Sequence, residues 1–452
     1  MINFIWDYKD LKRRLAMKKL KAVKENKKNI LFAWLGLTII LFLLISVSTL
    51  ASQRLDLNLD RCIEIALEKN LGYQISQSSV EVKEAQSEEA EGAKKTNVKL
   101  KAGYIQMNEA PDPESIIEGD FSYLFSTGQG IPQISVSISK VLYSGGKLES
   151  FIEQAEADQS IAFNELEQKK QEVIYQVTQA YYRVLQSEGL VKVSEQALTQ
   201  INAHMESSQA LLEEGMIAPI DLNRIKSQLS NLEHNLIKAE NGYELAVYNL
   251  NSIMGIDLET IIQLQNNLSY KPCEVTFSEA MESAIQNRPE IKNVGQQRII
   301  MEAMVDIAES SKKPQIAMNL ESGLSGWQVA VMGEIPIFDG GINDAKIKQA
   351  EIKLSQVDQS RKQVEQLIEL EVRSAYLNMK EAEKLIRVTD QGIENSMESF
   401  RIAQVKYNEG IATNTEVIDA QSALIEAETN HLNALYDYNT SYAALIKAMG
   451  IW

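Results

Sequence analysis

Two long stretches of the chain carry apolar or small side chains at alternating steps of four and three residues. The first series runs from Val173 to Leu212 and the second from Ile368 to Tyr407. Because this spacing averages 3.5 residues, it is typical of helices that wind around one another as a coiled coil. Proline, which would break a helix interior, is absent from both stretches. The pattern predicts unbroken helices at 146–212 and 341–408, the first about 100 Å long.

Shorter segments alternate between apolar and polar residues, which is the period of a β-strand. In Gln133–Tyr143, for example, Ile134, Val136 and Ile138 alternate with serines. Such segments predict two hairpins, at 98–143 and 315–338. Strands of roughly 9–11 residues with one apolar face match a transmembrane barrel, although two half-buried soluble hairpins would show the same alternation. Four strands cannot close a pore-sized barrel, so a membrane barrel would require several chains.

The sequence contains an internal duplication. A shift of 218 residues aligns Lys94-Lys95 with Lys312-Lys313, and a shift of 195 aligns Gly145-Gly146 with Gly340-Gly341. The difference places extra residues of the first copy at about 108–132, a stretch rich in Pro, Asp, Glu and Gly that predicts a long loop. Each copy is expected to run helix, strand, loop, strand, very long helix, short turn, helix. The expected repeats are 52–265 and 266–452, with final helices at 219–254 and 414–449.

Residues 1–51 have the pattern of an export signal. They hold ten Lys and Arg but only three acidic residues, so this segment carries +7 and leaves −24 on the rest of a chain of net charge −17. The apolar run Ile30–Val47 is followed by Thr49 and Ala51, which suit the small-residue positions before a cleavage site. An uncleaved anchor would show the same run, because its length could span a bilayer. Met17 is an alternative start. We expect a signal peptide at 1–51.

Composition narrows the class of protein further. Aromatic residues make up 7% of the chain, and it has 8 prolines, 2 cysteines and 3 histidines. This composition favours long helices over a compact mixed core, and a net negative chain is a poor partner for nucleic acid. Cys62 and Cys273 are too few for a Cys-rich metal site, and whether they pair is open. Because the sequence lacks a nucleophile-and-base arrangement, we expect no enzyme activity, no cofactor and no metal site.

Across 55–452 the sequence resembles the TolC-like outer membrane efflux protein family. The resemblance is carried by the duplication together with two strand-to-helix junctions and two turns between helices, which are KVLYSGGKL at Lys140–Leu148, EIPIFDGGIN at Glu334–Asn343, EEGMIAPID at Glu213–Asp221 and KYNEGIATNTEVIDAQ at Lys406–Gln421. It implies a mainly α, duplicated fold with a transmembrane β-barrel part. Four strands per chain would contribute to a trimeric 12-stranded barrel, and the coiled-coil helices would form an α-helical barrel.

The resemblance also implies a function and partners. A homotrimer in the cell outer membrane, with its helices in the periplasm, would passively export drugs, ions or secreted polypeptides, the last as in type I secretion. An inner-membrane transporter would supply the energy and a periplasmic adaptor would join the two, while outer-membrane lipid would surround the strands. The alternative is an exported, membrane-tethered coiled-coil scaffold or adaptor without a pore. Strands of barrel length with apolar outer faces favour the channel.

In this family, acidic residues just after the second turn line the closed periplasmic aperture. By resemblance these are Glu416 and Asp419, and three chains would set six carboxylates around a narrow axis. Like charges held close raise one another's pKa and concentrate cations. Two simpler roles stay open. Thr413 to Glu416 has the spacing of a capping box, and Asp419 could be a solvated surface acid.

Two further sets of site residues follow from the resemblance. The closed-state lock would contain Tyr407 and Asp221, although Tyr407 ends the apolar series and could be plain core. Asp221, in a first helical turn, would also suit the helix dipole. The lock arginine of the family falls at Ala412, which cannot form a pair. Adaptor contacts would lie at the helix tips, at Gly215, Met216, Gly410 and Ile411. The two glycines could instead simply end a helix.

Overall fold

The computed structural model describes residues 55–105, 131–265, 268–323 and 326–452. The expected signal peptide at 1–51 and almost all of the expected loop at 108–132 lie outside these residues. The described residues divide into a small unit, residues 55–56 and 260–263, and a large unit that contains the rest. Two short strands are β1 (Leu55–Leu57) and β4 (Ile262–Leu264). In the small unit the Leu55 N–H donates to the Ile261 carbonyl at 3.1 Å.

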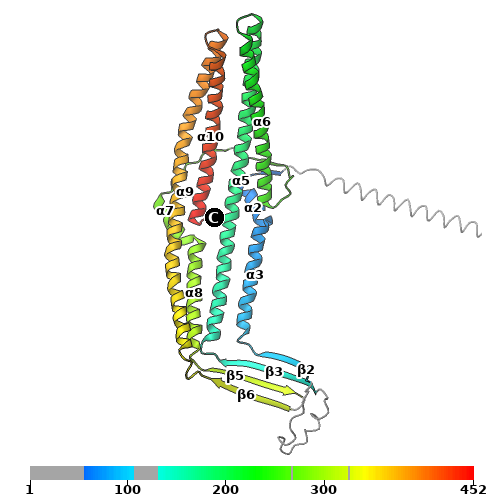
Figure 1. The fold of residues 1–452 in the computed structure, drawn as a ribbon, viewed down its shortest axis with the longest axis vertical. Helices are drawn as coiled ribbons and strands as arrows, with labels where there is room; N and C mark the ends of the chain where they lie inside the picture. Colours follow the sequence, from blue (N-terminus) through cyan, green and yellow to red (C-terminus); the bar gives the residue numbers. More distant parts are fainter. Residues whose placement is uncertain (1–54, 106–130, 266–267, 324–325) are drawn as a thin grey trace, which may run out of the picture. The chain divides into compact units, whose positions relative to one another are not determined.

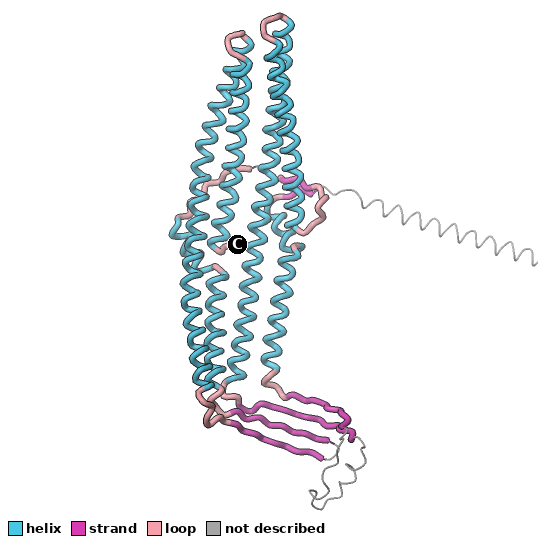
Figure 2. Tube along the Cα trace, in the orientation of Figure 1, coloured by secondary structure: helices cyan, strands magenta, loops and turns pink. Residues whose placement is uncertain are grey.

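The large unit contains the same series of helices twice (Figures 1 and 2). The first copy holds α2 (Leu59–Lys69), α3 (Leu71–Gly92), α5 (Lys147–Glu213) and α6 (Pro219–Met254). The second holds α7 (Phe277–Asn287), α8 (Pro289–Ser310), α9 (Ile342–Asn408) and α10 (Asn414–Met449). Corresponding helices have equal lengths of 11, 22, 67 and 36 residues. The duplication predicted from the sequence is therefore also a duplication of the fold.

The first helix expected in each copy is in fact two helices, so that part of the prediction was wrong. In the first copy the break falls at Asn70, whose side chain accepts a hydrogen bond from the Tyr73 N–H at 3.0 Å and donates to the Ile253 carbonyl at 2.9 Å. In the second copy it falls at Arg288, because Pro289 has no N–H to continue the ladder and favours a first helical position. A side-chain cap and a proline thus produce the same break in the two copies.

Four strands form one antiparallel sheet in the order β2-β3-β5-β6. Their bounds are Asn97–Ile105, Ile131–Tyr143, Gln315–Gly323 and Gly326–Glu334. The return strand, expected to reach Phe338, ends at Glu334, shortly before Pro336, which cannot donate to a strand ladder. Among the described strands, β2 and β6 each have a single neighbour. The sheet therefore has two edges in one chain.

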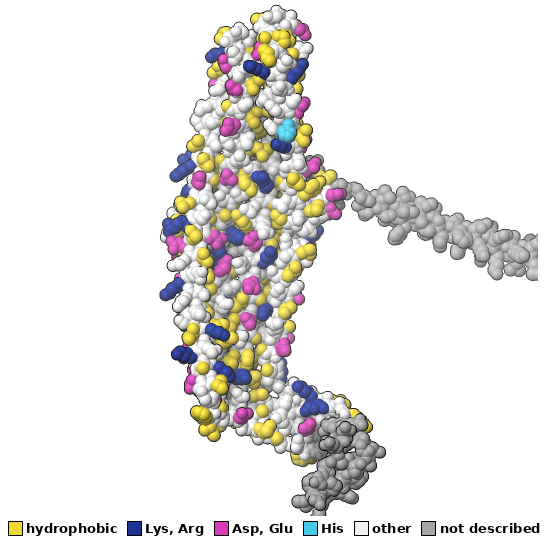
Figure 3. Space-filling model, in the orientation of Figure 1, with side chains coloured by type: hydrophobic (Ala, Val, Ile, Leu, Met, Phe, Trp, Pro, Cys, Tyr) yellow, Lys and Arg dark blue, Asp and Glu magenta, His cyan; other side chains and the backbone are white. Residues whose placement is uncertain are grey.

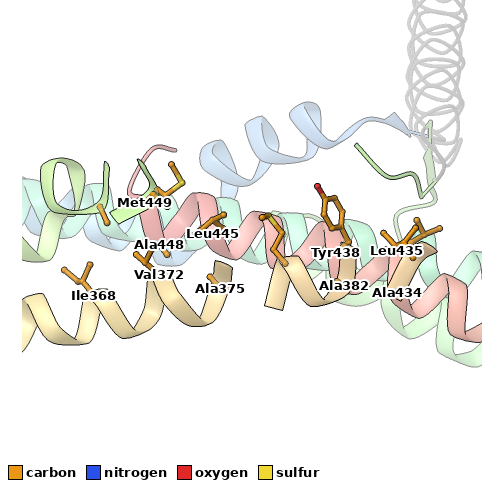
Figure 4. Close-up of a cluster of buried hydrophobic side chains, with 14 residues drawn as sticks. Ile368, Val372, Ala375, Ala382, Ala434, Leu435, Tyr438, Leu445, Ala448 and Met449 are labelled. Atoms are coloured by element: carbon orange, nitrogen blue, oxygen red, sulfur yellow. The ribbon is translucent and has the colours of Figure 1, made fainter. Parts of the chain in front are cut away.

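The predicted coiled-coil spacing is confirmed by the packing of α9 on α10. The first six positions of that series along α9 are all buried, namely Ile368, Val372, Ala375, Met379, Ala382 and Ile386. They share one apolar cluster with α10 side chains such as Leu435, Tyr438 and Leu445. Figure 4 shows the labelled side chains of this cluster where α9 and α10 lie side by side. The α9/α10 pair is thus a helical hairpin held by an apolar seam, and a second buried apolar cluster joins α5 to α6.

Within the described residues, no helix combines the length and apolar character that crossing a membrane requires. Apolar side chains are exposed on both edge strands of the sheet. Exposed side chains on alternate positions of β6 include Trp327, Val329 and Val331. In β2 the corresponding exposed set is Val98, Leu100 and Tyr104.

Candidate aperture and latch at the helical tips

Acidic and basic side chains are interspersed along the visible face of the long helices (Figure 3). Charge therefore does not single out one position on that face. The candidate residues lie instead at the two turns where each hairpin reverses, between α5 and α6 and between α9 and α10.

Both turns are built around a glycine with a left-handed backbone. Gly215 has φ of 72° and its N–H donates to the Leu212 carbonyl at 3.0 Å, while Gly410 has φ of 73° and donates to the Tyr407 carbonyl at 3.0 Å. Only glycine adopts such angles without steric cost, so both glycines have a structural role. The apolar residues that follow the two glycines have largely exposed side chains. Met216 is 61% exposed and Ile411 is 71% exposed, which leaves two apolar side chains at the tips free for contact.

Just below the turns, a buried polar network joins all four long helices. The Tyr407 hydroxyl is 2.8 Å from the Ser208 hydroxyl, and the edge of its ring meets the His204 ring at a centroid distance of 4.7 Å. His204 Nε2 is 2.8 Å from Asn414 Oδ1, and Asn414 Nδ2 donates to the Asp221 carbonyl at 3.0 Å. We call these five residues the tip network. It ties the α5/α6 hairpin to the α9/α10 hairpin.

The bonds of the tip network also settle which ring nitrogen of His204 carries the hydrogen. Because Asn414 Nδ2 donates to a carbonyl, its Oδ1 must be the acceptor for His204, and Nε2 is the donor. Burial lowers the pKa of His204, and the hydrogen bond to Asn414 opposes that shift without overcoming it. The ring is therefore a neutral donor within the closed network.

Two exposed hydrogen bonds add to the tip network. Arg224 Nη1 on α6 donates to Thr415 Oγ1 on α10 at 3.0 Å, and Ser207 on α5 donates to Asn408 Oδ1 on α9 at 3.1 Å. Arg224 also lines an open groove of about 400 Å³ between α6 and α10. Ala412, where the family arginine would lie, instead packs against an apolar cluster. Arg224 is thus a cationic link between the hairpins from a different helix.

The structure places Tyr407 and Asp221 in the same network but does not pair their side chains. Tyr407 bonds to Ser208, and Asp221 takes part through its backbone carbonyl. Sequence reasoning missed His204 and Asn414 as members of the network. The sequence marks them only weakly, because a polar residue beside an apolar seam is commonly solvated. In the structure His204 and Asn414 are instead only 5% and 3% exposed.

Glu416 and Asp419 are both exposed, three residues apart in the first turns of α10. Residues three apart lie on the same side of a helix, so the two carboxylates share one face. The Thr413 hydroxyl donates to Glu416 Oε1 at 3.2 Å and accepts the Glu416 N–H at 3.4 Å. Glu416 therefore helps to start α10, and its exposure leaves it available for a second role.

The described residues offer little support for metal binding or for cysteine chemistry. Across them, no group of three or more His, Cys, Asp and Glu side chains is arranged to hold a metal ion. Cys62 and Cys273 are free thiols, and burial raises the pKa of the Cys62 thiol to about 12. That thiol is therefore protonated near neutral pH and is a poor nucleophile.

The fold and the tips are those of an outer-membrane efflux protein. A family model described as outer membrane efflux protein matches residues 118–256 and 280–451, more than half of the chain, and the chain belongs to that family. Membership makes it an outer-membrane protein of the efflux class.

Individual relatives are distant in sequence. The chain is 21% identical to the outer membrane protein TolC of Vibrio cholerae over 332 residues, covering 70% of this chain and 76% of that protein. It is 22% identical to the cobalt-zinc-cadmium resistance protein CzcC of Cupriavidus metallidurans over 344 residues, covering 74% and 79%.

Solved structures share the fold. A membrane protein from Pseudomonas aeruginosa superposes with a TM-score of 0.76 at 16% identity, covering 87% of this chain and 92% of that one. The outer membrane protein VceC of Vibrio cholerae gives a TM-score of 0.74 at 15% identity, covering 87% and 96%. The predicted duplicated, mainly helical, TolC-like fold is thereby confirmed.

Proposed function

We propose that this chain is one subunit of a homotrimeric channel-tunnel that passively exports substrates across the periplasm and the outer membrane. The observation that carries the proposal is the open sheet of four strands, apolar on one face, joined directly to helices of 67 residues. Four strands are too few for a pore, whereas three chains would supply twelve. The long helices would continue the barrel as a tunnel in the periplasm, and residues 1–51 would direct export of the chain.

The substrate and the energy source would come from partners. A passive conduit needs an inner-membrane transporter, joined to it through a periplasmic adaptor, and it needs no catalytic residues of its own. The names of the relatives cover cobalt, zinc and cadmium resistance and solvent efflux. The substrate class of this chain is accordingly drugs, ions or secreted polypeptides, and the transporter would select among them.

Purified protein in planar lipid bilayers tests the proposal. We expect detergent to be needed for extraction, a trimer by light scattering, and discrete, long-lived conductance steps. A chain that is freely soluble, monomeric and silent in bilayers would instead be the scaffold or adaptor without a pore.

The acidic pair at the aperture is tested in the same recordings. In the double variant Glu416→Ala/Asp419→Ala, we expect block by divalent cations to weaken by about tenfold or more, because six carboxylates around one axis concentrate cations. Glu426→Ala removes an exposed acid further along α10 and is the matched control. Block and conductance equal to those of the wild type in the double variant would rule out an acidic ring.

The adaptor is proposed to contact the tips at Gly215, Met216, Gly410 and Ile411. Exposure of an apolar side chain at each turn supports this. A Met216→Asp/Ile411→Asp variant should keep its bilayer conductance but lose binding of the purified adaptor in a pull-down, since apolar contact is replaced by charge. Unchanged binding would place the adaptor elsewhere.

A further inference from the structure

A single charged side chain lies on the apolar face of the described strands. Ile138 on β3 is opposite Leu320, and two residues further along the strand Lys140 is opposite Met318, so Lys140 shares this face. A charge on the lipid-facing surface of a barrel is strongly destabilising at the middle of the membrane but nearly neutral at its boundary. In the proposed channel Lys140 is therefore expected at the membrane boundary, at the end of the sheet that meets the helices.

Two tyrosines on the same face agree with this level. Tyr143, the last residue of β3, is opposite Ile316, and Tyr104 is opposite Pro132 near the other end of β3. The two side chains are 47% and 68% exposed. About ten strand steps of about 3.3 Å, tilted by about 40°, separate the two levels by roughly 25 Å. The apolar band of a transmembrane barrel has this height and carries aromatic side chains at both edges, so Tyr143 marks the edge on the side of the helices.

A cleft of about 320 Å³ opens beside this edge, where the chain passes from β3 into α5 (Figure 1). Leu142, Tyr143 and Leu148 give it apolar walls, and its charged lining residues are Lys94 and Glu149. The Lys94 ammonium is 3.5 Å from Glu149 Oε1, and the lysine side chain is 47% exposed. Because an ammonium has three donors, Lys94 can hold a second acceptor. The cleft therefore combines apolar surface with an accessible cation.

Two further lysines flank the stretch 141–146, which lines the cleft. Lys140 comes directly before it and is exposed. Lys147 comes directly after it, and its ammonium lies 5.9 Å from the centroid of the Phe151 ring. Among the described residues, neither of these two ammonium groups has a carboxylate partner. Three lysines thus surround a cleft whose lining holds one carboxylate, and this balance of charge suits an anion.

The second copy forms the corresponding junction without the two flanking lysines. The shift of 195 residues places Ile335 at the position of Lys140 and Ile342 at the position of Lys147. The paired glycines of both junctions nevertheless have left-handed backbones, so the turn into the long helix has the same form. Because the turn folds with isoleucine at both positions, the two lysines are not needed for folding and are available for a ligand.

The junction of β3 stays accessible when further strands join the sheet. Within the described sheet β3 lies between β2 and β5 of its own chain. Strands of another chain would therefore be added at β2 or β6 and would not cover β3. In the proposed channel the apolar face of β3 remains turned toward lipid, and a lipid can reach the cleft from within the membrane.

We propose that this cleft binds an anionic glycerophospholipid from the periplasmic leaflet of the outer membrane. Lys94, Lys140 and Lys147 hold the phosphate, and the apolar face of β3 holds the acyl chains beside Leu142 and Tyr143. The stem of Lys140 lies along the apolar face while its ammonium reaches the headgroups, as long cationic side chains commonly do at a membrane boundary. The inference rests on the proposed channel and adds to it a lipid partner.

Binding of fluorescently labelled phosphatidylglycerol to the full-length protein in detergent tests the proposal. In Lys140→Gln/Lys147→Gln the apparent affinity should fall by about tenfold or more, the effect expected of two lysines at an anionic surface. Lys99→Gln/Lys101→Gln is the matched control, because it also removes two exposed lysines per chain, but from the polar face of β2. The control should bind the lipid as the wild type does. Lys140→Ile/Lys147→Ile, which copies the second junction, should lose binding as the glutamine variant does.

Competition identifies the ligand. Unlabelled phosphatidylglycerol should displace the probe, whereas zwitterionic phosphatidylcholine and inorganic phosphate should displace it poorly. Equal displacement by phosphatidylcholine would rule out recognition of an anionic headgroup, and equal displacement by inorganic phosphate would reveal a phosphate site instead of a lipid site.

Bilayer recordings of the same proteins separate this inference from the proposed function. We expect the glutamine variants to form trimers with the conductance of the wild type. Conducting trimers in which both glutamine variants bind the lipid equally well would overturn the lipid site and leave the channel intact. A wild-type monomer without conductance would overturn the channel, and the lipid site with it.

Discussion

Replacing Asn414 with alanine is expected to open the tips of the helices. The side chain is 3% exposed and holds both His204 Nε2 and the Asp221 carbonyl. Its loss would leave the buried His204 Nε2 without its partner, at about 1–3 kcal/mol, and would also remove the part-buried bond to the Asp221 carbonyl. Because every 1.4 kcal/mol changes an equilibrium about tenfold, the open fraction in bilayer recordings should rise by about tenfold or more.

A matched control is available at the neighbouring turn. Asn408 accepts one hydrogen bond from Ser207 at the surface, so Asn408→Ala removes a similar side chain whose partner can turn to water. Its conductance should stay close to that of the wild type. If Asn414→Ala and Asn408→Ala behaved alike, the tip network would not hold the hairpins together.

Lowering the pH should also open the tip network. Burial lowers the pKa of His204 below its ordinary value of 6.5 in the closed network, so an opened, hydrated ring binds a proton more readily. The neutral His204 ring stabilises the closed network fully at pH values above 6.5. This stabilisation is lost as the pH falls from 6.5 through the lowered pKa. The groups that contact the ring are Tyr407 from α9 and Asn414 from α10. Conductance of the wild type should therefore rise on acidification more steeply than that of His204→Gln.

The second large effect is expected at Arg288, where the break before α8 meets the end of α10. This side chain is 7% exposed and donates to Glu290 and Glu371 at 2.8 Å each, and to the Ala448 carbonyl at 3.4 Å. Burial opposes its charge, but the hydrogen bonds to Glu371 and Glu290 outweigh burial and raise the pKa of Arg288.

Arg288→Ala should lower the free energy of unfolding by about 3 kcal/mol, the low end for removing one partner of a buried ion pair. The low end applies because Glu290 and Glu371 keep 27% and 45% exposure. Arg298 on the same helix pairs with Glu302 at 51% exposure, so Arg298→Ala should cost at most about 1 kcal/mol. Denaturant unfolding of the two variants measures the difference, and equal losses would show that burial of Arg288 is unimportant.

Several features of this protein are determined by the sequence alone. The duplication, the two helices of 36 residues, and the alternation along the strands were all predicted at or near their observed bounds. These features depend on local periodicity and on proline and glycine, which act within a few residues of themselves. The bounds of α6 and α10 coincide with the prediction because Pro219 and Thr413 begin them and Gly255 and Gly450 end them.

Only the tertiary structure decided how the hairpins are joined. His204 and Tyr407 are separated by about two hundred residues, and no local pattern states that their rings touch or that Asn414 rather than the Asp221 carboxylate completes the network. The break at Asn70 likewise depends on a bond to Ile253, on a distant helix. Polar contacts of this kind follow from which helix faces meet, and the meeting of faces is a property of the packed fold.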